Sequence, residues 1–120
     1  MPHPQVDKIL ANAELAIKTF DLKYDEESVK WIDEFVERLR KSSHQSGVDK
    51  LISVLGSFVG ECARREFGGE WKEVNGQWGI RFDPPGVVAF PFNKIAKQFE
   101  SGHEGGDSIL GFYQSIRSFF

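Results

Sequence analysis

The stretch EWKEVNGQWGIRFD, residues 70–83, places Asn75-Gly76 between two short runs that alternate apolar and polar side chains. Asn-Gly is the strongest short signal for a two-residue β-turn, because both residues tolerate positive φ. The sequence therefore predicts a β-hairpin with a fixed register. The expected pairs, from the turn outward, are Val74 with Gln77, Glu73 with Trp78, Lys72 with Gly79, Trp71 with Ile80, and Glu70 with Arg81.

This register also predicts which side chains share a face of the sheet, because directly opposed residues do. Trp71, Trp78 and Ile80 fall on one face, which we expect to meet the core. Glu70 and Arg81 fall on the other face, where we expect a cross-strand ion pair.

Before the hairpin, apolar residues recur at steps of three and four, which is typical of amphipathic helices. Three helices are predicted, at residues 5–20, from an Asp25 cap to about residue 41, and at residues 48–67. Two glycines, Gly68 and Gly69, are a helix C-terminal signal and separate the third helix from the hairpin.

After the hairpin, DPPG predicts a turn and VVAF, residues 87–90, a third strand. A helix is predicted over residues 91–102, then a loop at HEGG, then a last helix capped by Asp107. Strands that are segregated from helices indicate an α+β fold with three N-terminal helices, a three-stranded antiparallel meander and two C-terminal helices. We expect one domain over residues 1–120, with residues 1–4 as a disordered tail.

Composition narrows the function classes. The chain has 120 residues, a net charge of −3 and one cysteine. Neither half of the chain has the basic surplus that a duplex nucleic-acid binder usually needs, which disfavours nucleic acid but leaves local basic patches open. A single cysteine cannot form an intramolecular disulfide, which suits a reducing compartment. There is no signal peptide pattern, and no apolar run approaches the roughly 18 residues of a membrane span. The expected location is the cytoplasm, without membrane or nucleic-acid partners.

The third predicted helix carries Gly56-x3-Gly60 followed by Glu61 and Cys62. Glycine in a helix costs roughly 1 kcal/mol relative to alanine, so we expect close approach of another backbone at these positions rather than a phosphate cradle, which needs a strand–loop–helix context. Cys62 continues the apolar stripe, which favours a buried small hydrophobe over a catalytic thiol.

Glu61 is the candidate for a functional carboxylate. It can pair with Arg64 or Arg65 at helical spacing, or it can serve a pocket. We favour the structural role, and the alternative is a binding site formed by Glu61, Arg65, Trp78 and Arg81 in which Glu61 has a raised pKa.

Metal and nucleophilic chemistry have no support in the sequence. The three histidines, His3, His44 and His103, lie in the tail and in predicted loops, without partners at metal-ligand spacing. A site at His103–Glu104 competes with a solvated linker, which we favour. No catalytic residue, metal or cofactor is predicted.

The segment from Gly56 onward resembles a group of small bacterial α+β domains of unknown function, in which a Gly-x3-Gly-Glu helix runs into a Gly-Gly-x-Trp strand. The resemblance implies the α+β fold over the second half of the chain, and a role through binding, as in immunity or accessory proteins, with no catalytic residues to carry over. The matching positions are Gly56, Gly60, Glu61, Gly69, Trp71, Pro91, Lys97, Gly102 and Tyr113.

Two functional hypotheses follow. The first is a small non-catalytic interaction protein, of immunity or regulatory type, that acts through a protein partner. The second is an enzyme or small-ligand sensor with a pocket around Glu61. A nucleic-acid accessory role would require salt-sensitive binding despite the negative charge. The terminal Phe119 and Phe120 also allow a homodimer through the C-terminal aromatic helix.

Overall fold

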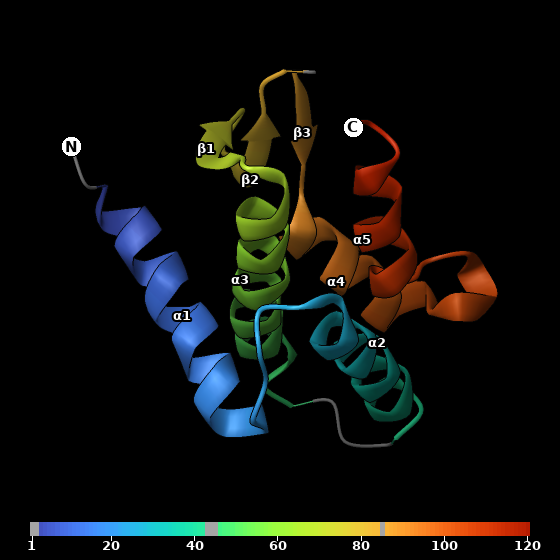
Figure 1. Ribbon diagram of the computed structural model, residues 1–120. Coiled ribbons are helices and arrows are strands. Elements are labelled where there is room, and N and C mark those ends of the chain that lie inside the picture. Colours follow the sequence, from blue (N-terminus) through green and yellow to red (C-terminus); the bar gives the residue numbers. More distant parts are fainter. Residues whose placement is uncertain (1–2, 43–45, 85) are drawn as a thin grey trace.

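The computed structural model describes residues 3–42, 46–84 and 86–120. The order of its elements is three helices, three antiparallel strands and two helices, which confirms the predicted α+β fold (Figure 1). The helices are α1 (Pro4–Phe20), α2 (Glu26–Arg40), α3 (Val48–Phe67), α4 (Pro91–Ser101) and α5 (Ile109–Arg117); the strands are β1 (Glu70–Val74), β2 (Gln77–Phe82) and β3 (Val87–Ala89); and a 3-10 turn, η1 (His103–Gly105), precedes α5.

The hairpin forms around Asn75 and Gly76, whose φ angles of 52° and 81° are those that a two-residue turn needs. All five predicted residue pairs between β1 and β2 are confirmed. The sheet order is β1-β2-β3, so β1 is an edge strand. The prediction of a Glu70–Arg81 ion pair is wrong. The Arg81 guanidinium lies 4.0 Å from the carboxylate of Asp83 in the following turn instead.

Helix α3 stands at the centre of the molecule, with α1 on one side and α4 on the other, and the sheet lies beyond its C-terminal end (Figure 1). Aromatic rings, not another backbone, occupy the space above its glycines, which corrects the sequence expectation. A Cβ at Gly56 would lie 2.5 Å from the Phe92 ring, and one at Gly60 would overlap the Trp71 ring. Both glycines therefore serve as sockets for aromatic side chains.

Helices α2, α4 and α5 pack together on the other side of α3. Asp25 caps α2 as predicted, and accepts a hydrogen bond from the Ser28 N–H at 2.8 Å. The cap of α5 is Ser108 rather than Asp107, which instead binds the Lys94 ammonium at 2.9 Å. A 3-10 turn also replaces the loop that was expected at HEGG.

The two ends of the described chain both contact the rest of the fold. Helix α1 begins at Pro4 and His3 caps it, so these two residues of the expected tail take part in the helix, and residues 1 and 2 lie outside the described residues. At the other end, the Phe120 ring stacks on Phe67 at 5.3 Å, while Phe119 remains 53% exposed. Within the described ranges, no helix combines the length and the hydropathy that crossing a bilayer requires.

Candidate functional site

Glu61 lies near the C-terminal end of α3 and is fully buried. Its carboxylate accepts four hydrogen bonds: from Arg64 Nε at 2.8 Å, Arg64 Nη2 at 2.7 Å, Arg65 Nε at 2.9 Å and the Trp71 indole Nε1 at 3.0 Å. The Arg64 contact is bidentate, the geometry in which guanidinium binds carboxylate best. Both oxygens of Glu61 are therefore fully engaged.

Burial by itself would raise the pKa of Glu61, but the hydrogen bonds from Arg64, Arg65 and Trp71 outweigh it and hold the pKa below its usual value. The alternative hypothesis requires the opposite, a carboxyl with a raised pKa. The donors are side chains and not backbone amides. This cluster ties α3 to β1, and Arg65 extends it by placing its guanidinium 3.8 Å from the centre of the Tyr24 ring.

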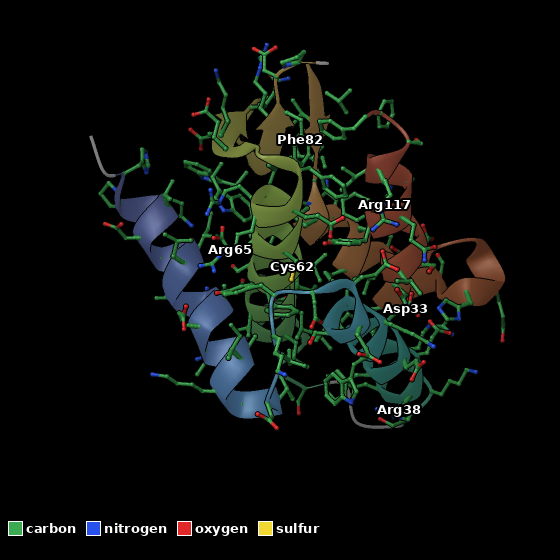
Figure 2. The ribbon with its side chains drawn as sticks, in the orientation of Figure 1. Asp33, Arg38, Cys62, Arg65, Phe82 and Arg117 are labelled. Carbon is green, nitrogen blue, oxygen red and sulfur yellow. The ribbon has the colours of Figure 1, made fainter. Side chains whose placement is uncertain are left out.

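Cys62 is 2% exposed, and desolvation raises the pKa of its thiol far above the ordinary value. Figure 2 shows its sulfur in the interior of the molecule, whereas Arg65 lies toward α1. A thiol that is buried and protonated is a poor nucleophile. Its environment is that of a small core residue, as the apolar stripe indicated.

The other two predicted site residues do not join Glu61 and Arg65. Arg81 lies opposite Glu70 on the sheet face away from Trp71 and Ile80. Trp78 lies on the same sheet face as Trp71, but its half-buried side chain makes no hydrogen bond to Glu61 or Arg65. The four residues therefore do not make up one pocket, although two of them, Glu61 and Arg65, are bonded directly.

A pocket of about 290 Å³ lies beside Trp78, between β2, α3 and the start of α4. Ile52, Trp78, Phe90 and Phe92 form its apolar walls. Its remaining lining is uncharged, made of amide and hydroxyl side chains, and includes the Asn93–Gln77 hydrogen bond of 3.0 Å. Without a charged group, this pocket suits an apolar side chain with neutral hydrogen-bonding groups around it.

Two further hollows, of about 590 and 380 Å³, follow β1 on the side of α1. They share Val6 of α1 and Trp71 of β1, so together they form one groove, which we call the α1–β1 groove. Its lining includes Glu70, Trp71, Lys72 and Glu73 in succession along the strand. Trp78 borders one end of this groove as well as the pocket described above. The His3 ring packs edge-on against Trp78, with 5.0 Å between the ring centroids.

A buried polar cluster at the start of α5 was not predicted from the sequence. Asp33, a charged residue of α2, is only 3% exposed. Its carboxylate accepts hydrogen bonds from Ser108 Oγ at 2.7 Å, the Leu110 N–H at 2.9 Å and the His103 ring. Figure 2 shows Asp33 where α2 meets the C-terminal elements.

The buried Gln98 completes this cluster from α4. Its amide nitrogen donates to the Asp33 carbonyl at 3.0 Å and to Glu37 at 3.0 Å, and its oxygen accepts from the Ile109 N–H at 2.7 Å. Asp33 and Gln98 therefore satisfy the first amides of α5, which have no partner within the helix. His103 contacts Asp33 and Glu37 rather than Glu104, so the imagined His103–Glu104 site does not form.

The cluster contains serine, histidine and aspartate but not in the order of a nucleophilic triad. In a triad, histidine lies between serine and aspartate. Here Asp33 lies between the other two, and Ser108 Oγ also accepts the Gly111 N–H at 3.0 Å as a helix cap. Burial would raise the pKa of Asp33, but the bonds from Leu110, Ser108 and His103 leave it lowered. The arrangement is that of a structural carboxylate.

Comparisons with protein-family models, with curated proteins and with solved structures gave no match to this chain. The resemblance to small bacterial domains therefore stays a prediction. Among the residues that the structure describes, no three His, Cys, Asp or Glu side chains gather in a way that could hold a metal ion. His44 lies outside those residues.

Proposed function

We propose that this chain is a small non-catalytic binding protein, of immunity or regulatory type, that acts on a protein partner from the cytoplasm. The observation that carries the proposal is the position of Trp78. It is half-buried on the hairpin and borders both the uncharged pocket and the α1–β1 groove. Tryptophan is one of the residues most enriched at the energetic hot spots of protein interfaces.

The chemistry of the pocket also supports a protein partner. An apolar wall rimmed by amide groups matches an apolar side chain and the peptide groups that flank it. A charged metabolite or a phosphate would find no counter-charge in the pocket lining.

The two candidate reactive groups of α3, the Glu61 carboxylate and the Cys62 thiol, are not available to a substrate. The Glu61 carboxylate is saturated by Arg64, Arg65 and Trp71, and Cys62 is buried. The hypothesis of an enzyme or sensor built around Glu61 therefore lacks the free carboxyl that it requires.

The test is affinity capture from the native host with the wild-type chain and with Trp78→Ala, followed by mass spectrometry. We expect a protein that the wild type retains and that Trp78→Ala loses. The matched control is Phe119→Ala, which also removes a half-exposed aromatic ring, and we expect it to retain the same protein.

Loss of the partner with Phe119→Ala but not with Trp78→Ala would move the interface to the C-terminal helix and contradict the role of Trp78. Sedimentation of the purified chain tests the homodimer expected through the same helix. A dimer that Phe119→Ala dissociates would support that expectation.

A further inference from the structure

We infer that the partner of this chain binds as an extended peptide that adds a fourth strand to the open edge of β1, inside the α1–β1 groove. The inference rests on the proposed function and specifies how the partner is held. The peptide carries an apolar side chain and a basic side chain on the face of its strand that points with Trp71 and Glu73.

The first step is the direction of the backbone groups of β1. In a two-residue hairpin the residues that flank the turn exchange both of their hydrogen bonds, and such pairs alternate with pairs that exchange none. Val74, Lys72 and Glu70 therefore bond to β2, while the N–H and C=O groups of Trp71 and Glu73 point away from it. No strand within the described residues pairs with that side of β1.

The second step is that the open edge lies in a hollow and not on a convex surface. The two hollows of the α1–β1 groove run along all four residues from Glu70 to Glu73, with Val6 and Leu10 of α1 in the opposite wall. A groove between a helix and an edge strand accepts a peptide that hydrogen-bonds to the strand and packs side chains against the helix.

The third step is the charge of the groove. Its lining contains the acids Asp7, Glu70 and Glu73 and the bases Lys72 and Arg64. Arg64 is engaged by Glu61, and none of the other four forms an ion pair with a described residue. Three carboxylates against one ammonium leave an acidic surplus, which a basic side chain of the peptide complements.

Side-chain alternation then divides the peptide into two faces. Residues that point with Trp71, Glu73 and Trp78 meet the apolar surface of Val6 and Leu10 and the carboxylates of Glu73 and Asp7. Residues that point with Glu70 and Lys72 meet one acid and one base, whose charges balance. A strand whose inward face carries both an apolar and a basic side chain matches this arrangement.

The experiment selects peptides from a random library on the immobilised full chain and measures the affinity of the best synthetic peptide by fluorescence anisotropy. The peptide is then N-methylated one residue at a time. Strand addition predicts a two-residue period: methylation at positions that face β1 lowers affinity about tenfold, and methylation at the intervening positions leaves it unchanged.

The protein side offers a matched pair at Glu73, whose N–H points outward. Glu73→Pro removes this donor without breaking the β1–β2 ladder, whereas Glu73→Ala removes only the carboxylate. We expect Glu73→Pro to bind the peptide about tenfold more weakly than Glu73→Ala does, with equal thermal midpoints. In the complex, hydrogen exchange at the Trp71 and Glu73 amides should slow.

The outcomes separate the two proposals. A peptide that depends on Trp78 but shows no two-residue period overturns strand addition and leaves the proposed function standing. If a partner is captured from the host but the library selection yields no peptide, strand addition is likewise overturned and the proposed function stands. Failure of both the selection and the capture overturns both proposals. Protection of the Trp71 and Glu73 amides that grows with protein concentration in the free chain would assign the edge to a second copy instead.

Discussion

The indole Nε1 of Trp71 donates a hydrogen bond of 3.0 Å to Oε1 of the buried Glu61, and so joins the last turns of α3 to the first strand. The same ring fills the space above Gly60. One side chain on the edge strand thus fills a helix socket and also donates a hydrogen bond to a buried carboxylate. The stability of the hairpin and the orientation of the α1–β1 groove both depend on it.

Trp71→Phe tests the hydrogen bond separately from the packing. Phenylalanine keeps an aromatic ring in the socket but leaves one lone pair of the buried Glu61 without its donor, so we expect a loss of about 1–3 kcal/mol in the free energy of unfolding. Urea denaturation measures it. Trp78→Phe on the same sheet face is the control and should cost less, because Trp78 does not contact Glu61. Equal losses in the two variants would contradict the importance of the Glu61 bond.

Gly60→Ala tests the socket. Alanine gains about 1 kcal/mol of helix propensity, but its Cβ would overlap a Trp71 ring that the hydrogen bond to Glu61 holds in place, and it would lie 2.9 Å from Pro91. We expect a net destabilisation of about 1–3 kcal/mol. Gly111→Ala in α5 is the control, because its Cβ would meet only the Ser108 side chain at 3.4 Å. It should be neutral or stabilising, and a stable Gly60→Ala protein would show that the ring can move.

Acid should unfold this protein through Glu61 and Asp33, whose pKa values are lowered in the folded state. A lowered pKa contributes stability that is present above the unfolded-state value, near 4, and is lost as the pH falls through the folded-state value. We expect the free energy of unfolding to decline from about pH 5 downward. Glu61→Gln and Asp33→Asn should each be less stable at pH 7 but show a flatter decline. Glu104→Gln, at an exposed position, should leave the slope unchanged.

Alkali provides the opposite test through the two tyrosines. Desolvation raises the pKa of Tyr24 to about 12, and burial with the 2.6 Å bond to Glu66 raises that of Tyr113 further. A raised pKa contributes stability below the unfolded-state value, near 10, that is lost as the pH rises through the folded-state value. Absorbance at 295 nm should therefore show little phenolate near pH 10.5 until the chain unfolds. A phenolate transition centred at pH 10 in a folded protein, monitored by circular dichroism, would contradict the raised pKa of both tyrosines.

Local sequence signals predicted those parts of the fold that depend on near neighbours. Asn75-Gly76 determines its turn by backbone preference alone, and every pair of the hairpin follows from it. The Asp25 cap and the Gly68 stop are equally local. The same holds for the Glu61 pairs with Arg64 and Arg65, since residues three and four apart share a helix face.

The remaining features depend on contacts that the sequence order hides. Asp33 lies one residue beyond the apolar Ile32, and its partners Ser108 and Leu110 come more than seventy residues later. A buried glutamine, Gln98, between the apolar Ile95 and Phe99 was the available signal for a polar cluster inside the core. The role of Gln98 depends on the packing of α4 against α2 and α5, which brings its hydrogen-bond partners together.

The anchoring of the first α5 amides by Asp33 and Gln98 has a consequence for the order of folding during synthesis. Asp33 of α2 emerges from the ribosome long before residues 103–110. Among the described residues, these and Gln98 supply all the hydrogen-bond donors to its carboxylate. Until residues 103–110 have been synthesised, the Asp33 carboxylate is ionised and exposed to water on a surface of α2 that is buried in the complete fold. The native packing of α2 is therefore completed only after α5 has been synthesised.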